Sequence, residues 1–390
     1  MLRKTDGLAL QRRARSTRYL PMVVAWQIVL VAIALLVVQQ EVWAYVAAGV
    51  VLLVAILLSV PVNGRTIPAT LKLGSAFRRR SRQRVEHPDH ASDLVPLAQW
   101  LPHLELTQIK DAHDGDIGVT ADGTSWSGIL EVTADHTLFT DRGAELDLNA
   151  LGALTRQDDV VFAGVQVVTL TVPAPSGGML PEGSPALGAY REILGENPPP
   201  ALRRTWVALR LDPRLCLEAV GRRGDGQTGV FATLRFGLHR AQALLKRHGM
   251  VTAPLDPLEI SDVIALVTGA SPDPTEPRTR EEWKAWFNDG LVHETRAVHS
   301  FGASPSAAYQ RLLDVVSKAP AMMAVTSFTV SPGRPPQGAV RLVTPNVEQA
   351  VAADEYVVSA LSGAVKLGPL GGTQVPGMLA TVPLGRRIDQ

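Results

Sequence analysis

The stretch "VVQQEVWAY" (residues 37–45) decides the fold of the N-terminal region, because it interrupts an apolar run over residues 22–60. A helix needs roughly 20 apolar residues to cross about 30 Å of hydrocarbon. A single helix over the whole run would be about twice too long for an ordinary tilt to absorb. The polar residues 39–41, Gln-Gln-Glu, therefore mark a turn, and the sequence predicts a transmembrane hairpin of two helices over residues 21–62.

Two aromatic residues, Trp43 and Tyr45, directly follow this turn. Amphipathic rings favour the depth of the lipid headgroups, so both are expected at the membrane interface. Six basic residues precede the first span and seven follow the second, whereas none lies between the spans. By the positive-inside rule, both termini are expected in the cytoplasm. The sequence thus predicts a multi-pass protein of the inner (plasma) membrane, and a cleaved signal peptide is a weaker interpretation because a second long apolar segment follows so closely.

The segment "FRRRSRQR" (residues 77–84) carries five arginines, which we call the juxtamembrane arginine cluster: Arg78, Arg79, Arg80, Arg82 and Arg84. One interpretation is a topology anchor on anionic lipid headgroups, where each basic residue contributes about 1 kcal/mol. The other is a docking patch for an acidic partner subunit. We favour the anchor, and both interpretations place the cluster just inside the membrane.

The formal net charge of the chain is only +1, but basic and acidic side chains are segregated along the sequence. Residues 1–86 hold 13 basic and 3 acidic side chains, whereas residues 87–390 hold 25 basic and 34 acidic ones. An acidic body repels nucleic acid, so no nucleic-acid partner is expected. The single cysteine, Cys216, excludes an internal disulfide framework and is expected to be a small buried residue.

The body alternates segments rich in β-branched residues with amphipathic helical ones, which predicts a mixed α/β domain. Strands are expected over residues 160–175 and over residues 205–213, where Trp206 and Ala208 alternate with Val207 and Leu209 and both faces are expected to be partly buried. Residues 269–282 are expected to be a surface excursion, and residues 365–390 to be strand or loop broken by glycine and proline. Helices are expected over residues 213–222, 229–248, 256–267, 304–318 and 346–361. The predicted organisation is a basic cytoplasmic N-terminus (1–20), the hairpin (21–62), a basic juxtamembrane linker (63–93) and a cytoplasmic α/β domain (94–390), with a candidate subdivision near residues 272–281.

Chemistry-bearing motifs are scarce. The pair Asp114 and Asp116 in "DGD" resembles the DxD with which nucleotide-sugar glycosyltransferases hold a divalent metal, and hard cations favour such oxygen ligands. The same residues are also typical of a tight turn, which we favour, because Asp-Gly supplies the positive φ that turns require. The histidines at 87–90 and 293–299 lack metal-ligand spacing, so no cofactor and no catalytic residue is expected.

Two consecutive stretches carry a family resemblance: "RTWVALRLDPRLCLEAVGRRGDGQTG" (residues 204–229) and "LLKRHGMVTAPLDPLEI" (residues 244–260). With the hairpin and the basic juxtamembrane segment, they resemble EccE, a core membrane component of the actinobacterial type VII (ESX) secretion system. Asp225 departs from the more glycine-pure loop of the family.

The resemblance implies a structural and assembly role beside the membrane subunits EccB, EccC and EccD, of which EccC is the motor ATPase. It also implies a cytoplasmic fold similar to glycosyltransferases, in which Asp114 and Asp116 would be a relic. Two other hypotheses stay open: a membrane-anchored glycosyltransferase-like enzyme that uses these aspartates and a divalent metal, and a membrane-tethered regulatory binding module.

Overall fold

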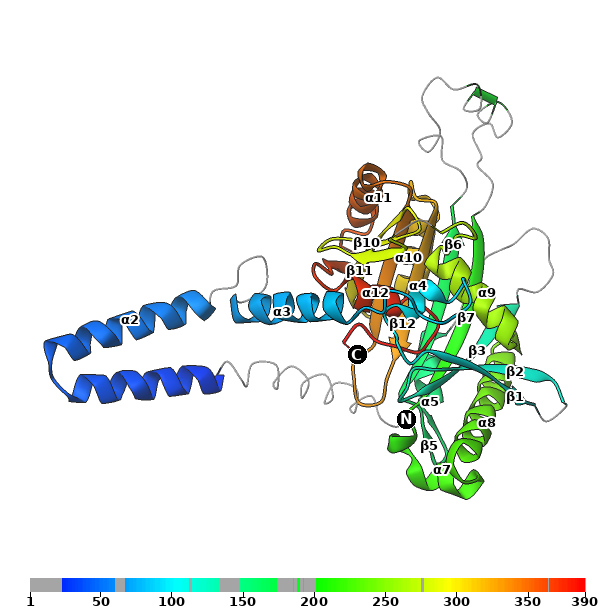
Figure 1. Cartoon of the computed structure of the whole chain (residues 1–390), viewed down its shortest axis with the longest axis horizontal. Helices are drawn as coiled ribbons and strands as arrows, with labels where there is room; N and C mark the ends of the chain where they lie inside the picture. The colour runs from blue at the N-terminus through cyan, green and yellow to red at the C-terminus, as the bar shows by residue number, and fades with distance from the viewer. Residues whose placement is uncertain are drawn as a thin grey trace. The chain divides into compact units, whose positions relative to one another are not determined.

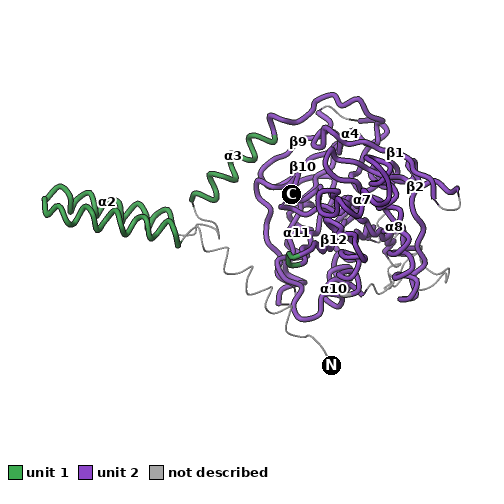
Figure 2. The backbone as a smooth tube through the Cα atoms, turned by 90° about the horizontal axis from the view of Figure 1, so that it is seen from below, with its two compact units in different colours: residues 1–80, 333–335 green, residues 81–332, 336–390 purple. Residues whose placement is uncertain are grey.

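The structure is a computed structural model that describes residues 23–59, 67–111, 114–133, 147–173, 185, 188, 189, 192, 201–274, 277–363 and 365–389. The chain forms two compact units (Figure 2), residues 1–80 with 333–335 and residues 81–332 with 336–390. We describe each unit by itself.

The N-terminal unit contains the expected apolar hairpin. A shorter apolar helix, Val23–Val38, is followed by α2 (Val42–Ser59), which is long and apolar enough to cross a membrane. The turn falls where the polar residues interrupt the apolar run, and Gln40 there adopts a positive φ of 52°. Ala44 and Ala48, one turn apart, are the buried residues of α2. Small side chains at such positions allow two helices to approach closely.

The other elements are distributed as follows. The helices are α3 (Ile67–Gln83), α4 (Val95–Ala98), α5 (Leu148–Leu154), the 3-10 turn η2 (Pro213–Leu215), α7 (Leu217–Arg223), α8 (Gly226–Arg247), α9 (Pro257–Thr268), α10 (Pro305–Val316), α11 (Val347–Ala360) and α12 (Gln374–Leu379). The strands are β1 (Glu105–Lys110), β2 (Asp116–Ala121), β3 (Trp126–Thr133), β4 (Arg156–Gln157), β5 (Val160–Val161), β6 (Gly164–Val172), β7 (Leu202–Leu211), β8 (Val251–Pro254), β9 (Thr279–Glu281), β10 (Trp286–Asn288), β11 (Leu291–Ser300), β12 (Met323–Val330), β13 (Gln337–Thr344) and β14 (Lys366–Pro369).

A 12-stranded sheet organises the larger unit, with the order β1-β2-β3-β7-β6-β12-β13-β11-β10-β9, while β8 pairs with β3 and β14 with β11. All strand pairs within the described residues are antiparallel. The mixed α/β expectation is confirmed. The likeness to glycosyltransferases is not supported, because the described sheet has no parallel βαβ unit of the kind that binds nucleotides in doubly wound folds.

Helices cover both faces of this sheet, as Figure 1 shows, and each face has its own hydrophobic core. The side chains of β7 are divided between these two cores. Val207 and Leu209 enter the core beneath α8, α10 and α11. Trp206 and Ala208 enter the core beneath α4, α9 and α12. Successive side chains of a strand point to opposite faces. The alternation of side chains along this strand therefore belongs to a sheet whose two faces are both buried.

Two local predictions are wrong. The strand expected over residues 160–175 is broken at Phe162, so that β5 pairs with the short β4 and β6 begins afresh at Gly164. The Phe162 ring turns into the core against Gly237 of α8, where an added Cβ would lie 2.1 Å from it. The segment 365–389, read as strand or loop, contains helix α12.

A buried cation ties three elements of this core together. Arg341 of β13 is fully buried and donates to Thr381 Oγ1 (2.7 Å), to His293 Nδ1 (2.8 Å) and to the Val267 carbonyl (2.7 Å). The last bond satisfies a carbonyl in the final turn of α9, which has no partner within the helix. Burial lowers the pKa of Arg341 to about 9, and burial with the nearby Arg341 charge holds the pKa of His293 well below its usual value. His293 is therefore neutral, and its Nδ1 accepts a hydrogen bond from the Arg341 guanidinium.

Candidate functional site: the juxtamembrane junction

The apolar helices present the surface that a bilayer would cover. Trp43 and Tyr45 lie in the first turn of α2, beside the hairpin turn, and are 59% and 51% exposed. Most apolar side chains of α2 are likewise exposed, and a soluble protein rarely leaves so large an apolar patch uncovered. The position of the two rings at the membrane interface remains a prediction.

Helix α3 carries four members of the juxtamembrane arginine cluster. Its first half is apolar and its last two turns are basic, and none of its residues is buried. Cations at a helix C-terminus each stabilise the helix by about 0.3–1 kcal/mol through the macrodipole. Arg78, Arg79 and Arg82 are exposed, so their charges are open to an anionic surface. Binding of these arginines to anionic lipid headgroups, or alternatively to an acidic partner subunit, stays a prediction.

The fifth member of the cluster, Arg84, lies just beyond α3 and has a different role. Its Nη1 donates to the Thr279 carbonyl oxygen at 2.5 Å, and its Nη2 lies 3.9 Å from Glu86 Oε1. Thr279 belongs to β9, the edge strand of the large sheet. The cluster therefore contains three exposed arginines on the helix (Arg78, Arg79 and Arg82) and one arginine, Arg84, that binds the body.

A chain of hydrogen bonds continues this attachment. Trp100 Nε1 donates to Thr279 Oγ1 (3.0 Å), Thr279 Oγ1 donates to Gln99 Oε1 (2.7 Å), and Gln99 Nε2 donates to the Glu86 carbonyl (3.0 Å). Thr279 is fully buried and Gln99 nearly so. Because an open edge strand is a liability for aggregation, the segment after α3 also protects β9.

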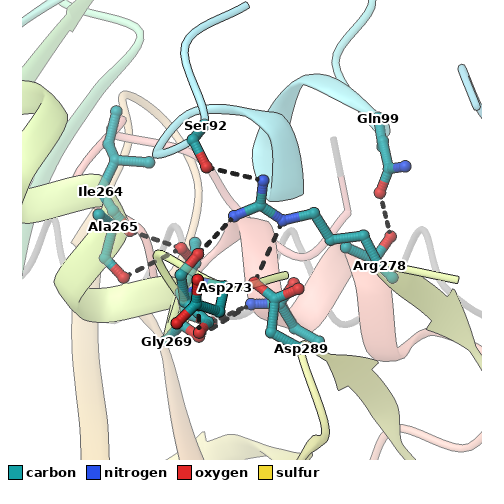
Figure 3. Close-up of polar contacts among 12 residues, drawn as sticks. Ser92, Gln99, Ile264, Ala265, Gly269, Asp273, Arg278 and Asp289 are labelled. Atoms are coloured by element: carbon teal, nitrogen blue, oxygen red, sulfur yellow. Dashed lines mark hydrogen bonds and ion pairs between the residues drawn. The ribbon is translucent and has the colours of Figure 1, made fainter. Parts of the chain in front are cut away.

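An ion pair beside β9 completes the junction (Figure 3). Arg278 Nε donates to Asp289 Oδ2 (3.1 Å), and its Nη1 donates to Ser92 Oγ (3.1 Å). The Ser271 amide donates to the same Asp289 oxygen at 2.9 Å. The side chains of Arg278 and Asp289 are only 6% and 0% exposed. Buried charges persist only when they are paired and hydrogen-bonded, so this pair holds Ser271, Arg278 and Asp289 against Ser92 in the segment after α3.

Sequence reasoning missed this junction. Thr279 and Arg278 fall in the proline-rich stretch that was read as a surface excursion, and their partners lie almost two hundred positions away in the chain. Trp100 was the one local signal, since a partly buried indole N–H needs an acceptor. Pairings over such distances leave no periodic trace in the sequence.

The candidate metal ligands Asp114 and Asp116 lie at the β1–β2 hairpin. Asp114 has a φ of 63°, and the Asp111 amide donates to the Gly115 carbonyl at 2.8 Å. Asp116 forms an exposed ion pair with Lys110, and this hydrogen bond lowers the pKa of Asp116. The favoured interpretation as a turn is therefore confirmed, and no group of three potential ligands is placed to hold a metal within the described residues.

Cys216 is buried, as expected. Burial raises the pKa of its thiol, so the group is a poor nucleophile at neutral pH. It lies at the start of α7, in the segment of strand, turn and helices that carries the family resemblance. The glycine-containing loop after it is a helix-to-helix connection, in which Gly224 separates α7 from α8.

Comparison with known proteins supports the resemblance. Residues 199–298 match the family described as "EccE: Putative type VII ESX secretion system translocon, EccE". The chain is 26% identical over 306 residues to the ESX-1 secretion system protein EccE1 of Mycobacterium tuberculosis, in both strain CDC 1551 / Oshkosh and strain H37Rv. The match covers 76% of this chain and 58% of the relatives' length, so the chain spans less than two thirds of them.

A structural comparison adds little. A solved alkyldihydroxyacetonephosphate synthase superposes with a TM-score of 0.30 at 8% identity, over 63% of this chain and 40% of that one, which is too weak to support an argument. The family match, in contrast, contains both stretches that carried the resemblance. The resemblance is thereby confirmed: residues 199–298 match the EccE family, and 76% of the chain is similar to an ESX-1 secretion system protein.

Proposed function

We propose that the chain is a non-catalytic structural and assembly subunit of a type VII secretion membrane complex, and that it supports protein export across the inner membrane. The observation that carries the proposal is the relation to EccE1 over 76% of the chain, together with the match of residues 199–298 to the family. An assembly subunit needs a membrane anchor and a body with surfaces for partners, and this chain supplies apolar helices and a large α/β unit.

The juxtamembrane junction supports this role. Arg84, Gln99 and Trp100 bind the buried Thr279, and Arg278 binds Ser92 beside it. These bonds order the chain segment that leaves α3. An ordered segment at this edge of the body gives neighbouring subunits a defined surface to bind, which is what an assembly role requires.

We further propose that both apolar helices span the membrane and that both termini are cytoplasmic. The support is the distribution of charge, since basic residues flank the hairpin on both sides and its turn carries only Glu41. In this arrangement Trp43 and Tyr45 lie at the far interface. The exposed arginines of α3 then lie at the cytoplasmic leaflet, where they bind anionic headgroups.

The partners that follow from the relation are the other membrane subunits EccB, EccC and EccD, with the lipid bilayer around the hairpin. In the domain organisation that we propose, the juxtamembrane linker ends near residue 93, and residues 272–281 separate two parts of the body. A glycosyltransferase-like activity is not favoured, because the Asp116 carboxylate is paired with Lys110 at an exposed hairpin.

Deletion and complementation test the proposed function. We expect that a strain lacking this chain fails to export its type VII substrates and that the wild-type chain restores export. A variant with Asp114→Asn and Asp116→Asn should restore it equally, because these side chains only form a turn. Normal export in the deletion strain would contradict the proposal, and failure of a folded aspartate variant would favour the enzyme.

A further inference from the structure

A polar pocket of about 370 Å³ lies in the larger unit. Its size falls in the lower part of the roughly 300–1,000 Å³ range of small-molecule sites. Its charged lining consists of Asp122, Arg210, Asp212, Arg214 and Arg386. We call it the arginine pocket.

The centre of the pocket holds two guanidinium groups on one carboxylate. Asp122 Oδ2 lies 2.6 Å from Arg210 Nη2 and 2.5 Å from Arg386 Nη1. The three side chains are 7%, 8% and 13% exposed, respectively. The charged lining as a whole has three guanidinium groups and two carboxylates, because Asp212 also attracts Arg210, so one positive charge of the pocket has no counterion among the lining residues.

The protonation behaviour of these groups agrees with an excess of positive charge. Burial raises the pKa of Asp122, but attraction by Arg210 and Arg386 outweighs it and the pKa is lowered. Burial and repulsion by Arg210 lower the pKa of Arg386. In addition, the buried Nε–H of Arg386 has no acceptor among the described residues. Buried donors are rarely left without a partner, so the hydrogen bonding of this guanidinium is incomplete.

The backbone next to Arg386 fixes the position of this arginine. Ser127 Oγ donates to the Leu384 carbonyl (2.9 Å), and the Gly385 amide donates to Gln166 Oε1 (2.8 Å). Gly385 has a φ of 66°, and an added Cβ would lie 2.5 Å from the Arg210 Cβ. Only glycine allows the C-terminal segment to approach β7 so closely. Two like charges are thus held together by the fold, instead of being left free to separate.

The rim of the pocket adds further donors. Arg214 is 71% exposed and is paired with Asp212 (2.7 Å). Thr124 and Ser125 also line the pocket, in the turn whose amides donate to Asp122 Oδ1 at 3.4 Å and 3.1 Å. Because the turn amides already donate to Asp122, the charged donors of the pocket come from β7 and the residues after it and from the C-terminal segment. A tetrahedral phosphoryl group, with three or more acceptor oxygens, suits such an arrangement better than a two-oxygen carboxylate, and arginine forks match phosphate geometry.

We propose that the arginine pocket binds the phosphoryl group of a small molecule, either inorganic phosphate or a small organic phosphate. The bound group neutralises the one positive charge of the lining that has no counterion. The pocket is larger than one phosphate needs, so an organic phosphate fills it better. The competing account is a purely structural clip, in which Arg386 only fastens the C-terminal segment to Asp122.

The test uses the full-length chain, purified in an uncharged detergent without phosphate. Thermal unfolding and calorimetric titration are recorded at constant ionic strength with inorganic phosphate, glycerol 3-phosphate and acetate. We expect both phosphates to raise the unfolding temperature and bind at millimolar or lower concentration, with acetate much weaker. Tighter binding of glycerol 3-phosphate than of inorganic phosphate identifies an organic phosphate as the ligand, and the reverse order identifies inorganic phosphate.

Three variants separate binding from a clip. Arg386→Gln should weaken phosphate binding about tenfold or more, since a charge-assisted hydrogen bond is lost. Arg214→Gln, at the exposed rim, keeps the fold and should weaken phosphate binding several-fold. Asp122→Asn should strengthen phosphate binding, because the removed carboxylate competes with phosphate for the arginines. The variant should unfold at a lower temperature than the wild type in chloride, and phosphate should raise its unfolding temperature more than that of the wild type.

Arg240→Gln is the matched control, because it removes an equally charged side chain from a surface ion pair with Asp158 elsewhere. It should leave phosphate binding unchanged. The proposal is overturned if phosphate acts no more strongly than acetate, or if Arg214→Gln and Arg240→Gln reduce binding equally. It is also overturned if Asp122→Asn is destabilised without any rescue by phosphate, as a clip predicts.

Discussion

The buried ion pair of the junction offers a sharp test of how the body is attached to the segment that leaves the membrane. We choose Asp289→Asn, because Asp289 has a φ of 44° and asparagine tolerates this left-handed conformation. The substitution keeps the shape of the side chain and removes its charge. Arg278, whose side chain is 6% exposed, is then left without its counterion.

The expected magnitude follows from the burial of both partners. Removing one partner of a buried ion pair destabilises a protein by about 3–5 kcal/mol. For a unit of this size, that loss corresponds to a fall of roughly 5–8 °C in the unfolding temperature. The assay is thermal unfolding of the full-length chain in detergent, followed by tryptophan fluorescence.

Two further variants provide controls. Glu282→Gln breaks the nearby pair with Arg280, whose side chains are 52% and 54% exposed, and should cost less than about 1 kcal/mol. Combining Asp289→Asn with Arg278→Gln removes both charges and should be less destabilising than Asp289→Asn alone. An Asp289→Asn variant as stable as the Glu282→Gln control, or a double variant with strictly additive losses, would refute the reasoning.

The remaining predictions concern the anchor, the hairpin and pH. Replacing the whole juxtamembrane arginine cluster by glutamine should disturb membrane topology or lower the yield of the complex, measured by cysteine accessibility and native electrophoresis; unchanged insertion and yield would count against it. The Asp114→Asn, Asp116→Asn variant should unfold within about 0.5 kcal/mol of the wild type, as expected for an exposed turn, and a larger loss would contradict that interpretation. Burial and the nearby Asp354 charge raise the pKa of Glu294 to about 7. Because the unfolded chain ionises this group first, stability should fall as pH rises from about 4.5 to 7. Glu294→Gln should therefore stabilise the chain at pH 8 by about 1–2 kcal/mol after allowance for partial exposure, and much less at pH 5; equal effects at both values would contradict the assignment.

Local patterns in the sequence were sufficient for part of the fold. Residues 39–41 placed the hairpin turn, because a charged and two amide side chains cannot lie within a continuous span. The alternation of Trp206 and Ala208 with Val207 and Leu209 indicated a strand buried on both faces, and the structure confirms it. The Asp-Gly pair at Asp114 likewise indicated a turn, for the steric reason that few residues accept a positive φ.

Features that depend on contacts between residues far apart in the chain could not be predicted from the sequence. Nothing near Phe162 shows that its ring must meet Gly237, so the break between β5 and β6 was missed. The bonds of Thr279 to Gln99 and Trp100 join segments that are separated by most of the body. Asp122 and Arg386 meet only because the sheet brings the β2–β3 turn beside the C-terminal segment.

The claim that the chain is a subunit of a type VII secretion complex is tested most directly by native electrophoresis of mild-detergent membrane extracts that carry an affinity-tagged copy. The proteins that co-migrate are identified by mass spectrometry, and the arginine-cluster variant is run beside the wild type. We predict a very large band that contains EccB, EccC and EccD, with less of it in the variant. Migration of the wild-type chain alone, in extracts where the other subunits still form their own large complex, would contradict the account.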